Sequence, residues 1–202
     1  RDRGYHTAHI GKWHTGVDTG FGRDWDFQMV WNRPRHATNA GQYYDNQLIE
    51  INGGKAKLVK GYTTDWYTDR AEEYIRGEHR EANKPWYLWL CYGAVHGPFI
   101  PAQRHREALP DANVTAPLDV FKGSKHRHGK PQYVQEMNNW IPNDRGEPAM
   151  RKGVTQRTVD NRPIHGNTLN GWVRQYHQGV LALDEAVGRL MKVLEETGQA
   201  KN

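Results

Sequence analysis

The sequence has one cysteine and no long apolar run, and each shortage excludes a class of protein. With Cys91 as the only cysteine among 202 residues, the chain cannot form an internal disulfide framework or a zinc site built from several cysteines. Its longest apolar stretches are far shorter than a membrane-spanning helix requires, so we expect no membrane span. Hydrophobic residues make up 36% of the chain, below the usual share of a globular protein.

Aromatic residues and positive charge are well represented. Eight tryptophans, ten tyrosines and four phenylalanines are typical of a folded protein, and we expect most of the tryptophans to lie in the core. Lysine and arginine exceed aspartate and glutamate by 28 to 23, a net charge of +5. Their densest group, over residues 122–130, is interpreted as a solvated loop with His126 and His128 exposed. We therefore expect no nucleic-acid partner.

The order of the predicted elements indicates an α/β fold. The chain opens with what looks like the tail of a helix over 1–5, closed by Gly4. The elements that follow are a buried strand over 7–13, an apolar run over 25–31, a hairpin over 45–59 turning at Asn52-Gly53-Gly54, a helix over 66–75 capped by Thr63-Thr64-Asp65, a strand over 86–95 buried on both faces, a loop-rich stretch over 98–163 and a helix over 172–196. Strands alternating with helices favour a sheet with parallel strands.

Basic residues follow two of the predicted strands. Lys12 and His14 close the first strand, and alternation along a strand sends both side chains to the same side. His96 comes directly after the strand over 86–95. Ligands of parallel α/β sheets bind at the carboxyl edge, so these three residues could hold an oxyanion there. A solvated strand end, and a histidine satisfied by the backbone, are the alternatives that the residues leave open.

The same segments carry a resemblance to the sulfatase family. GYHTAHIGKWHTG, over residues 4–16, is similar to the family signature G-Y-x-T-x-x-x-G-K-W-H-x-G. The segments over 20–26, 62–71, 85–99 and 176–190 then resemble, in family order, a glycine-rich turn, the helix before the central strand, the PFFLYLSYNAPHGPF stretch and the helix Y-x-A-x-V-x-x-L-D-x-x-V-G-R-L. The resemblance spans nearly the whole chain in one register.

The resemblance implies an alkaline-phosphatase-like core with a mixed, mostly parallel sheet flanked by helices. Residues 1–202 would be the central part of a single catalytic domain of a larger protein. That protein would hydrolyse a sulfate monoester, of a sulfated carbohydrate or an aryl sulfate. Lys12 would contact the sulfate oxygens, His14 would hydrogen-bond the hydroxyl of the nucleophile, and His96 would help protonate the leaving alcohol. The family also favours an exported or periplasmic bacterial enzyme.

The nucleophile and the metal ligands of the family have no counterpart in this sequence. Sulfatases convert the Cys or Ser of C/S-x-P-x-R to formylglycine, and neither Cys91 nor Ser124 stands in that motif. Asp45-Asn46 and Asp160-Asn161 lack the context of the family's metal site and are interpreted as turns. The formylglycine and a divalent cation, expected to be Ca²⁺, would therefore involve residues outside 1–202. Together with the absence of an initiating methionine, this predicts an internal piece that is inactive alone.

Two other functions remain open from the sequence. A phosphodiesterase or phosphonate hydrolase of the same superfamily could use Lys12, His14 and His96 on a phosphorus oxyanion. It would have an unconverted Thr or Ser nucleophile and a two-metal ligand set. A non-catalytic polyanion-binding module would instead use the net positive charge, and its binding to heparin or nucleic acid would weaken with salt.

Overall fold

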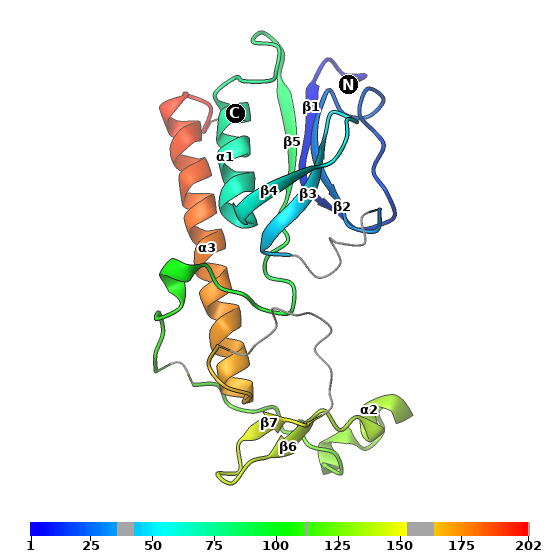
Figure 1. Ribbon diagram of the computed structural model, residues 1–202, viewed down its shortest axis with the longest axis vertical. Coiled ribbons are helices and arrows are strands. Elements are labelled where there is room, and N and C mark those ends of the chain that lie inside the picture. Colours follow the sequence, from blue (N-terminus) through cyan, green and yellow to red (C-terminus); the bar gives the residue numbers. More distant parts are fainter. Residues whose placement is uncertain (36–42, 112, 153–163, 202) are drawn as a thin grey trace. The chain divides into compact units, whose positions relative to one another are not determined.

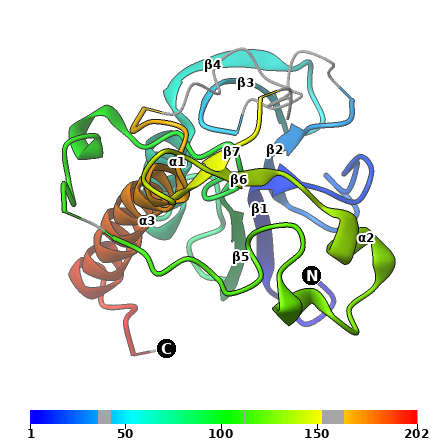
Figure 2. The ribbon, with the colours of Figure 1, turned by 90° about the horizontal axis from the view of Figure 1, so that it is seen from below.

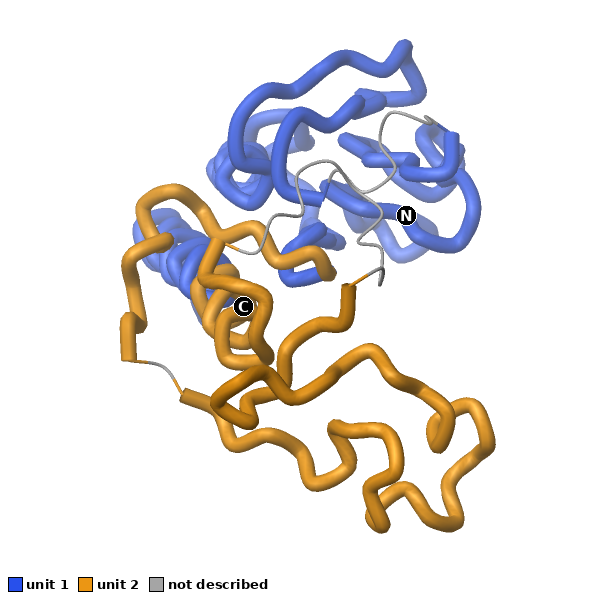
Figure 3. Tube along the Cα trace, turned by 60° about the horizontal axis from the view of Figure 1, so that its bottom comes forward, with its two compact units in different colours: residues 1–96, 180–202 blue, residues 97–179 orange. Residues whose placement is uncertain are grey.

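The computed structural model describes residues 1–35, 43–111, 113–152 and 164–201 (Figure 1). They form two compact units, which Figure 3 distinguishes by colour: unit 1 comprises residues 1–96 and 180–202, and unit 2 comprises residues 97–179. The long helix α3, Leu169–Glu196, begins in unit 2 and ends in unit 1. It confirms the helix predicted over 172–196.

Unit 1 is built on a mixed five-stranded sheet in the order β4-β3-β2-β1-β5. Its strands are β1 (His6–Trp13), β2 (Phe27–Asn32), β3 (Asp45–Ile51), β4 (Lys57–Tyr62) and β5 (Trp86–Cys91). Strand β1 pairs in parallel with both β2 and β5, and the antiparallel hairpin of β3 and β4 extends the sheet beyond β2. The predicted α/β class is therefore confirmed, with a hairpin that turns where the glycine pair predicted it.

Gly11 allows β1 and β5 to approach each other at their carboxyl ends. It lies opposite Cys91, and its φ of +118° is in the region that favours glycine. A Cβ at this position would lie 1.9 Å from the carbonyl oxygen of Cys91. Any other residue would therefore push the two strands apart at the edge where the predicted site residues lie.

Helix α1, Thr63–Ile75, covers one face of the sheet. The buried ring of Tyr74 packs there, and its hydroxyl donates to the carbonyl oxygen of His6 over 3.1 Å. The predicted helix is confirmed, but its predicted cap is wrong. The N-cap residue is Tyr62, and Thr63 lies inside the helix, where its hydroxyl donates to a backbone carbonyl in the segment before β3. The hydroxyl thus joins two elements and does not cap the helix.

The C-terminal half of α3 lies beside α1 (Figures 1 and 2). The guanidinium of Arg189 donates to Asp69 over 2.6 Å and to Glu72 over 2.8 Å, and both acceptors lie on α1. These charge-assisted hydrogen bonds fix the two helices against each other. Among the described helices, none combines the length and the apolar character needed to cross a membrane.

Strand β5 is less buried than the sequence predicts. Its apolar run suggests burial on both faces, but Tyr87 and Trp89, which share one face of the strand, are 51% and 40% exposed. The tryptophans follow the same trend, since Trp31 alone among the eight is buried. The apolar run correctly predicts a strand, but it carries no information on which segments cover the two faces of that strand.

Two short segments differ from their predicted form. The opening residues form a turn and not the end of a helix, with the amide of Gly4 donating to the carbonyl of Arg1. Asp45 and Asn46, interpreted as a turn, begin β3 with a register irregularity in its pairing with β4. Asp160-Asn161 lies outside the described residues.

The described residues of unit 2 have little regular structure, as predicted for residues 98–163. Its elements besides α3 are η2 (Gln103–His105), η3 (Lys125–Arg127), α2 (Gln132–Glu136), β6 (Trp140–Pro142) and β7 (Pro148–Met150). Strands β6 and β7 pair as an antiparallel ribbon. Residues 153–163 of this stretch lie outside the described residues.

The basic segment over 122–130 is organised around a buried arginine. The Arg127 side chain donates to the carbonyl oxygens of Asp119 and Val120 over 2.7 and 2.9 Å, and to that of Val134 over 3.0 Å. His126 and His128 are exposed, as predicted, but Arg127 is only 5% exposed. The interpretation as a solvated loop is therefore wrong for Arg127, which serves as a hydrogen-bonding core for its neighbours.

Candidate functional site

Two of the three predicted site residues come from neighbouring parallel strands. Strands β1 and β5 are paired from His6–Trp86 to Gly11–Cys91, so both end at the same edge of the sheet. Lys12 is the penultimate residue of β1, and His96 follows the end of β5 by five residues. This is the carboxyl edge at which the sequence predicts a ligand site.

Lys12 and His96 contact the same aromatic ring, that of Tyr43. The ammonium nitrogen of Lys12 lies over this ring, 4.7 Å from its centre. The His96 imidazole stacks on it in parallel, with the centres 4.0 Å apart and the planes at 3°. Tyr43 is 3% exposed, and its ring forms an edge-to-face pair with that of Trp31 of β2, with the planes at 84°. The buried tyrosine ring therefore helps to hold both side chains in position.

The loop that carries His96 is anchored to the same tyrosine segment through its backbone. Gly93 approaches so closely that a Cβ there would lie 2.6 Å from the carbonyl oxygen of Tyr43. The hydroxyl of Tyr44 donates to the carbonyl oxygen of His96 over 2.6 Å. The His96 side chain is exposed while its backbone is held, a combination that suits a residue meeting a ligand.

A second cation, Arg33, lies on the Tyr43 ring. Its guanidinium carbon is 5.7 Å from the centre of that ring. Burial lowers the pKa of Lys12 from its ordinary value, and the positive charge of Arg33 lowers it further. In the described part of the chain, neither cation has a carboxylate within ion-pair distance. Positive charge is therefore concentrated at this edge, and no described carboxylate balances it.

His14 is the predicted site residue that the structure does not join to the other two. It follows β1 directly, its side chain is exposed, and its carbonyl accepts from the amide of Gly16. Within the described ranges, its imidazole makes no hydrogen bond or ion pair. Alternation predicts the side that it shares with Lys12, but the strand ends before His14, so no strand pairing fixes its orientation.

Tyr43 and Arg33 also belong to this site, but their place in it was not predicted from the sequence. Both lie in the connection between β2 and β3, where no periodicity marks a buried position. The adjacent aromatic residues Tyr43 and Tyr44, just before a predicted hairpin, were the available signal for a buried anchor. Arg33 carried no signal, because a single arginine beside a proline in a connection is usually a surface residue.

A separate ionisable pair, His9 and Asp18, lies deeper in the sheet. The Asp18 carboxylate oxygen Oδ2 accepts from His9 Nδ1, Trp25 Nε1 and Gln28 Nε2, over 2.8, 2.9 and 2.7 Å. His9 is fully buried, and burial lowers its pKa although Asp18 acts in the opposite direction. This cluster ties the connection after β1 to the sheet.

The described residues hold one group of metal-ligand side chains, Glu73, Glu78 and His79, whose donor atoms lie within 4.8 Å of one another. The His79 ring stacks on Phe27, the first residue of β2. Because β1 and β2 are parallel, this places the group at the end of the sheet opposite Lys12. It therefore cannot supply a metal to the edge with Lys12 and His96.

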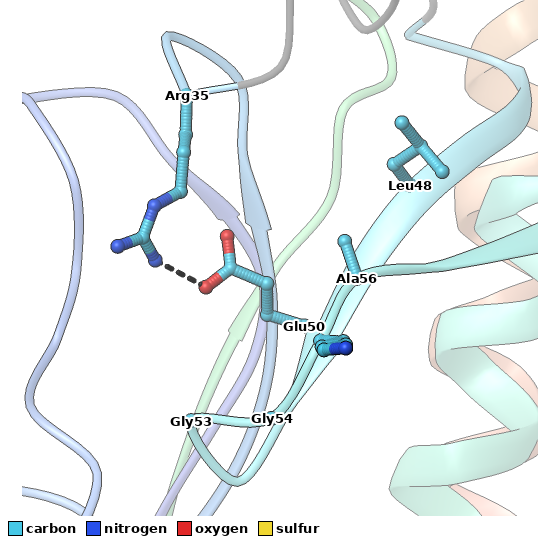
Figure 4. Close-up of a pocket in the computed structure, with 7 residues that line it drawn as sticks. Arg35, Leu48, Glu50, Gly53, Gly54 and Ala56 are labelled. Atoms are coloured by element: carbon cyan, nitrogen blue, oxygen red, sulfur yellow. Dashed lines mark hydrogen bonds and ion pairs between the residues drawn. The ribbon is translucent and has the colours of Figure 1, made fainter.

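A shallow hollow of about 490 Å³ lies on the β3–β4 hairpin (Figure 4). Residues 53–56 of the turn line it, together with Leu48 and the ion pair of Arg35 with Glu50, whose atoms are 2.6 Å apart. The two charges in its wall therefore already interact with each other. Neither Lys12 nor His96 lines this hollow.

Comparisons with known proteins agree with the resemblance in the motifs. The sequence model of the sulfatase family matches residues 1–202. The chain is 30% identical to N-acetylglucosamine-6-O-sulfatase of Bacteroides thetaiotaomicron, over 98% of this chain and 40% of that protein. It is 24% identical to N-acetylglucosamine-6-sulfatase of Homo sapiens, over 83% of this chain and 26% of that protein.

Among solved structures, the chain resembles a protein determined in complex with its substrate D-glucosamine-2-N,6-O-disulfate. The TM-score is 0.70 at 23% identity, covering 98% of this chain and 46% of that one. At this identity the likeness shows the fold, and it confirms the alkaline-phosphatase-like core. The chain thus spans less than half the length of these proteins, while the family match covers all of its residues. On this match, the chain belongs to the sulfatase family.

Proposed function

We propose that this chain provides the Lys12, His14 and His96 part of the catalytic centre of a sulfuric ester hydrolase. The observation that carries the proposal is the delivery of Lys12 and His96, by two adjacent parallel strands, to one buried tyrosine ring. Cations at a carboxyl edge that have no counter-ion among the described residues suit an anionic group such as a sulfate ester. The chemistry of this edge and the family membership thus point to the same class of reaction.

Each residue has a role that the chemistry of ester cleavage requires. Negative charge stays on the non-bridging sulfate oxygens, where the ammonium of Lys12 stabilises it. Charge also develops on the departing oxygen, and His96, with an exposed ring on a fixed backbone, can deliver a proton to it. His14, exposed just beyond β1, would hydrogen-bond the nucleophile, as the family resemblance implies.

The family's formylglycine would supply the nucleophile, and a divalent cation, we propose Ca²⁺, would neutralise sulfate charge. The described residues do not fit either group. Cys91 ends β5, and burial raises the pKa of its thiol. The cluster of Glu73, Glu78 and His79 lies at the opposite end of the sheet. We therefore assign neither group to residues of this chain.

For the substrate, we propose a carbohydrate that carries a 6-O-sulfated glucosamine. The support comes from the names of the relatives, two of which are N-acetylglucosamine-6-sulfatases, and from the disulfated glucosamine bound by the structural neighbour. Because the family resemblance favours an exported or periplasmic bacterial enzyme, we also propose that location for the protein that contains this chain.

The test is release of inorganic sulfate from N-acetylglucosamine-6-sulfate by the product of the complete reading frame that encodes this chain. We expect Lys12→Gln and His96→Gln each to lower kcat/KM by about 10²–10³-fold, because each removes a group that meets the charge of the transition state. His128→Gln, a change of an exposed histidine in unit 2, is the matched control and should leave turnover unchanged.

Two outcomes would contradict the proposal. One is wild-type turnover by both the Lys12 and the His96 variants. The other is faster cleavage of a phosphate diester than of any sulfate ester, which would favour the phosphorus chemistry of the same superfamily. Residues 1–202 on their own should release no sulfate, and turnover by the purified chain would show that it contains a nucleophile not identified here.

A further inference from the structure

Arg33 lies on the Tyr43 ring without a counter-ion among the described residues. Its guanidinium and the Lys12 ammonium share the Tyr43 ring, at 5.7 and 4.7 Å from the centre. Its Nε is buried and, within the described residues, has no hydrogen-bond partner. An arginine has five N–H donors, so most of the hydrogen-bonding capacity of Arg33 is available for a ligand.

The neighbouring Arg35 shows what a structural arginine looks like in the same segment. Its guanidinium donates to Glu50, a carboxylate that is 4% exposed, over 2.6 Å (Figure 4). One arginine of the segment thus has a buried counter-ion. The other lies near Lys12, where like charges repel each other.

An oxyanion between Lys12 and Arg33 would remove both the repulsion between the two cations and the lack, among the described residues, of an acceptor for the Arg33 side chain. It would pair two cations that otherwise repel each other, and it would give the buried N–H of Arg33 an acceptor. A guanidinium fork binds two oxygens of a tetrahedral anion at once, whereas an ammonium acts as a point charge. The two groups are therefore complementary ligands and not duplicates.

We propose that Arg33 is a second anion-binding residue of this site, which holds the sulfate group together with Lys12 while the Tyr43 ring fixes the position of both cations. The choice of a sulfate group as the anion rests on the proposed function. The pairing of the two cations on one ring does not, because it follows from the geometry of residues 12, 33 and 43.

The experiment is a titration of the chain with sodium sulfate, with sodium chloride keeping the ionic strength constant. Binding is followed by the NMR signals of the His96 ring, which stacks on Tyr43. The variants are Arg33→Gln, Arg33→Lys and Lys12→Gln. Arg23→Gln is the control, since it makes the same change of charge on a 72% exposed side chain that is paired with Asp24. Circular dichroism and thermal unfolding verify that every variant is folded.

We expect saturable binding by the wild type and an increase in Kd of roughly tenfold for Arg33→Gln, as the loss of a charge-assisted hydrogen bond predicts. Arg33→Lys, which keeps the charge and loses the fork, should give a smaller increase, and Arg23→Gln none. If Arg33→Gln binds like the wild type while Lys12→Gln loses affinity, the role of Arg33 is refuted and the Lys12 site stands. If neither variant changes Kd, or if the wild type does not saturate, the oxyanion site of the proposed function fails as well.

Discussion

Strand β1 carries two clusters of ionisable side chains, only three residues apart. In the first, His9 and Asp18 are 0% and 6% exposed, and one oxygen of the carboxylate accepts from three side chains. In the second, Lys12 and Arg33 share an aromatic ring and, in the described part of the chain, have no carboxylate partner. In the first cluster the carboxylate is enclosed by hydrogen-bond donors, whereas in the second the two cations lack an acceptor among the described residues and border the exposed ring of His96.

This difference in hydrogen bonding and charge distinguishes side chains that stabilise the fold from side chains that are suited to bind a ligand. A buried carboxylate is tolerated only when donors surround it, and the His9–Asp18 cluster meets that condition. Two cations held together without a counter-ion lower stability, and such an arrangement is typical of a binding site. Substitutions in the two clusters should therefore change stability with opposite signs.

The largest effect is expected for Asp18→Asn. The change keeps the shape but replaces an acceptor by an NH₂ group that faces the donors of His9, Trp25 and Gln28. We expect the free energy of unfolding in urea to fall by about 3–5 kcal/mol. Asp24→Asn is the control, because Asp24 is exposed and pairs with its neighbour Arg23, and it should leave stability unchanged. Equal effects of the two substitutions would show that the buried network contributes nothing.

The second largest effect on stability is expected at Gly11, which lies between the two clusters in the sequence. Alanine at this position would combine a strained φ of +118° with a contact of 1.9 Å to the Cys91 carbonyl. We expect Gly11→Ala to cost about 3 kcal/mol and to shift the NMR signals of the His96 ring, because β5 must move away from β1. Gly188→Ala in α3 meets nothing within 4 Å and should be neutral or stabilising. If Gly11→Ala leaves the His96 signals in place, β1–β5 pairing does not position His96.

Only some residues of the Lys12–Arg33 cluster and its surroundings could be predicted from the sequence. Lys12 and His96 could be assigned to one edge because strand order and the carboxyl-edge rule depend on local patterns. Tyr43 and Arg33 reach that edge from a connection without periodicity, so their contribution depends on tertiary contacts alone. The exposure of Trp89 was not predicted for a related reason, because an apolar run indicates a strand but does not show what covers its faces.

A smaller effect is the dependence of stability on pH through His9. Burial lowers the pKa of His9 in the folded chain, and its Nε2 is buried without a partner among the described residues. The unfolded chain therefore binds a proton near pH 6.5 that the folded chain does not. Stability is then fully present above that pH and is lost as the pH falls below it.

We expect a loss of about 1 kcal/mol from His9 between pH 7.5 and pH 5.5, measured by urea unfolding. His6, whose pKa burial also lowers, contributes in the same direction. His9→Phe should therefore reduce the pH dependence without removing it. An unchanged slope in this variant would mean that His9 is protonated as readily in the folded chain as in the unfolded one.

The smallest expected effect is a gain in stability, and it tests the Lys12–Arg33 cluster. Lys12→Met removes a half-buried cation from the neighbourhood of Arg33 and keeps an apolar chain over the Tyr43 ring. We expect a gain in unfolding free energy of roughly 0.5 kcal/mol, kept small by solvent screening and smaller still at high salt. Lys57→Met, at an exposed lysine that begins β4, should leave stability unchanged. A clear loss of stability in Lys12→Met would place Lys12 with His9 and Asp18 as a residue that holds the fold, and its charge would no longer point to a ligand.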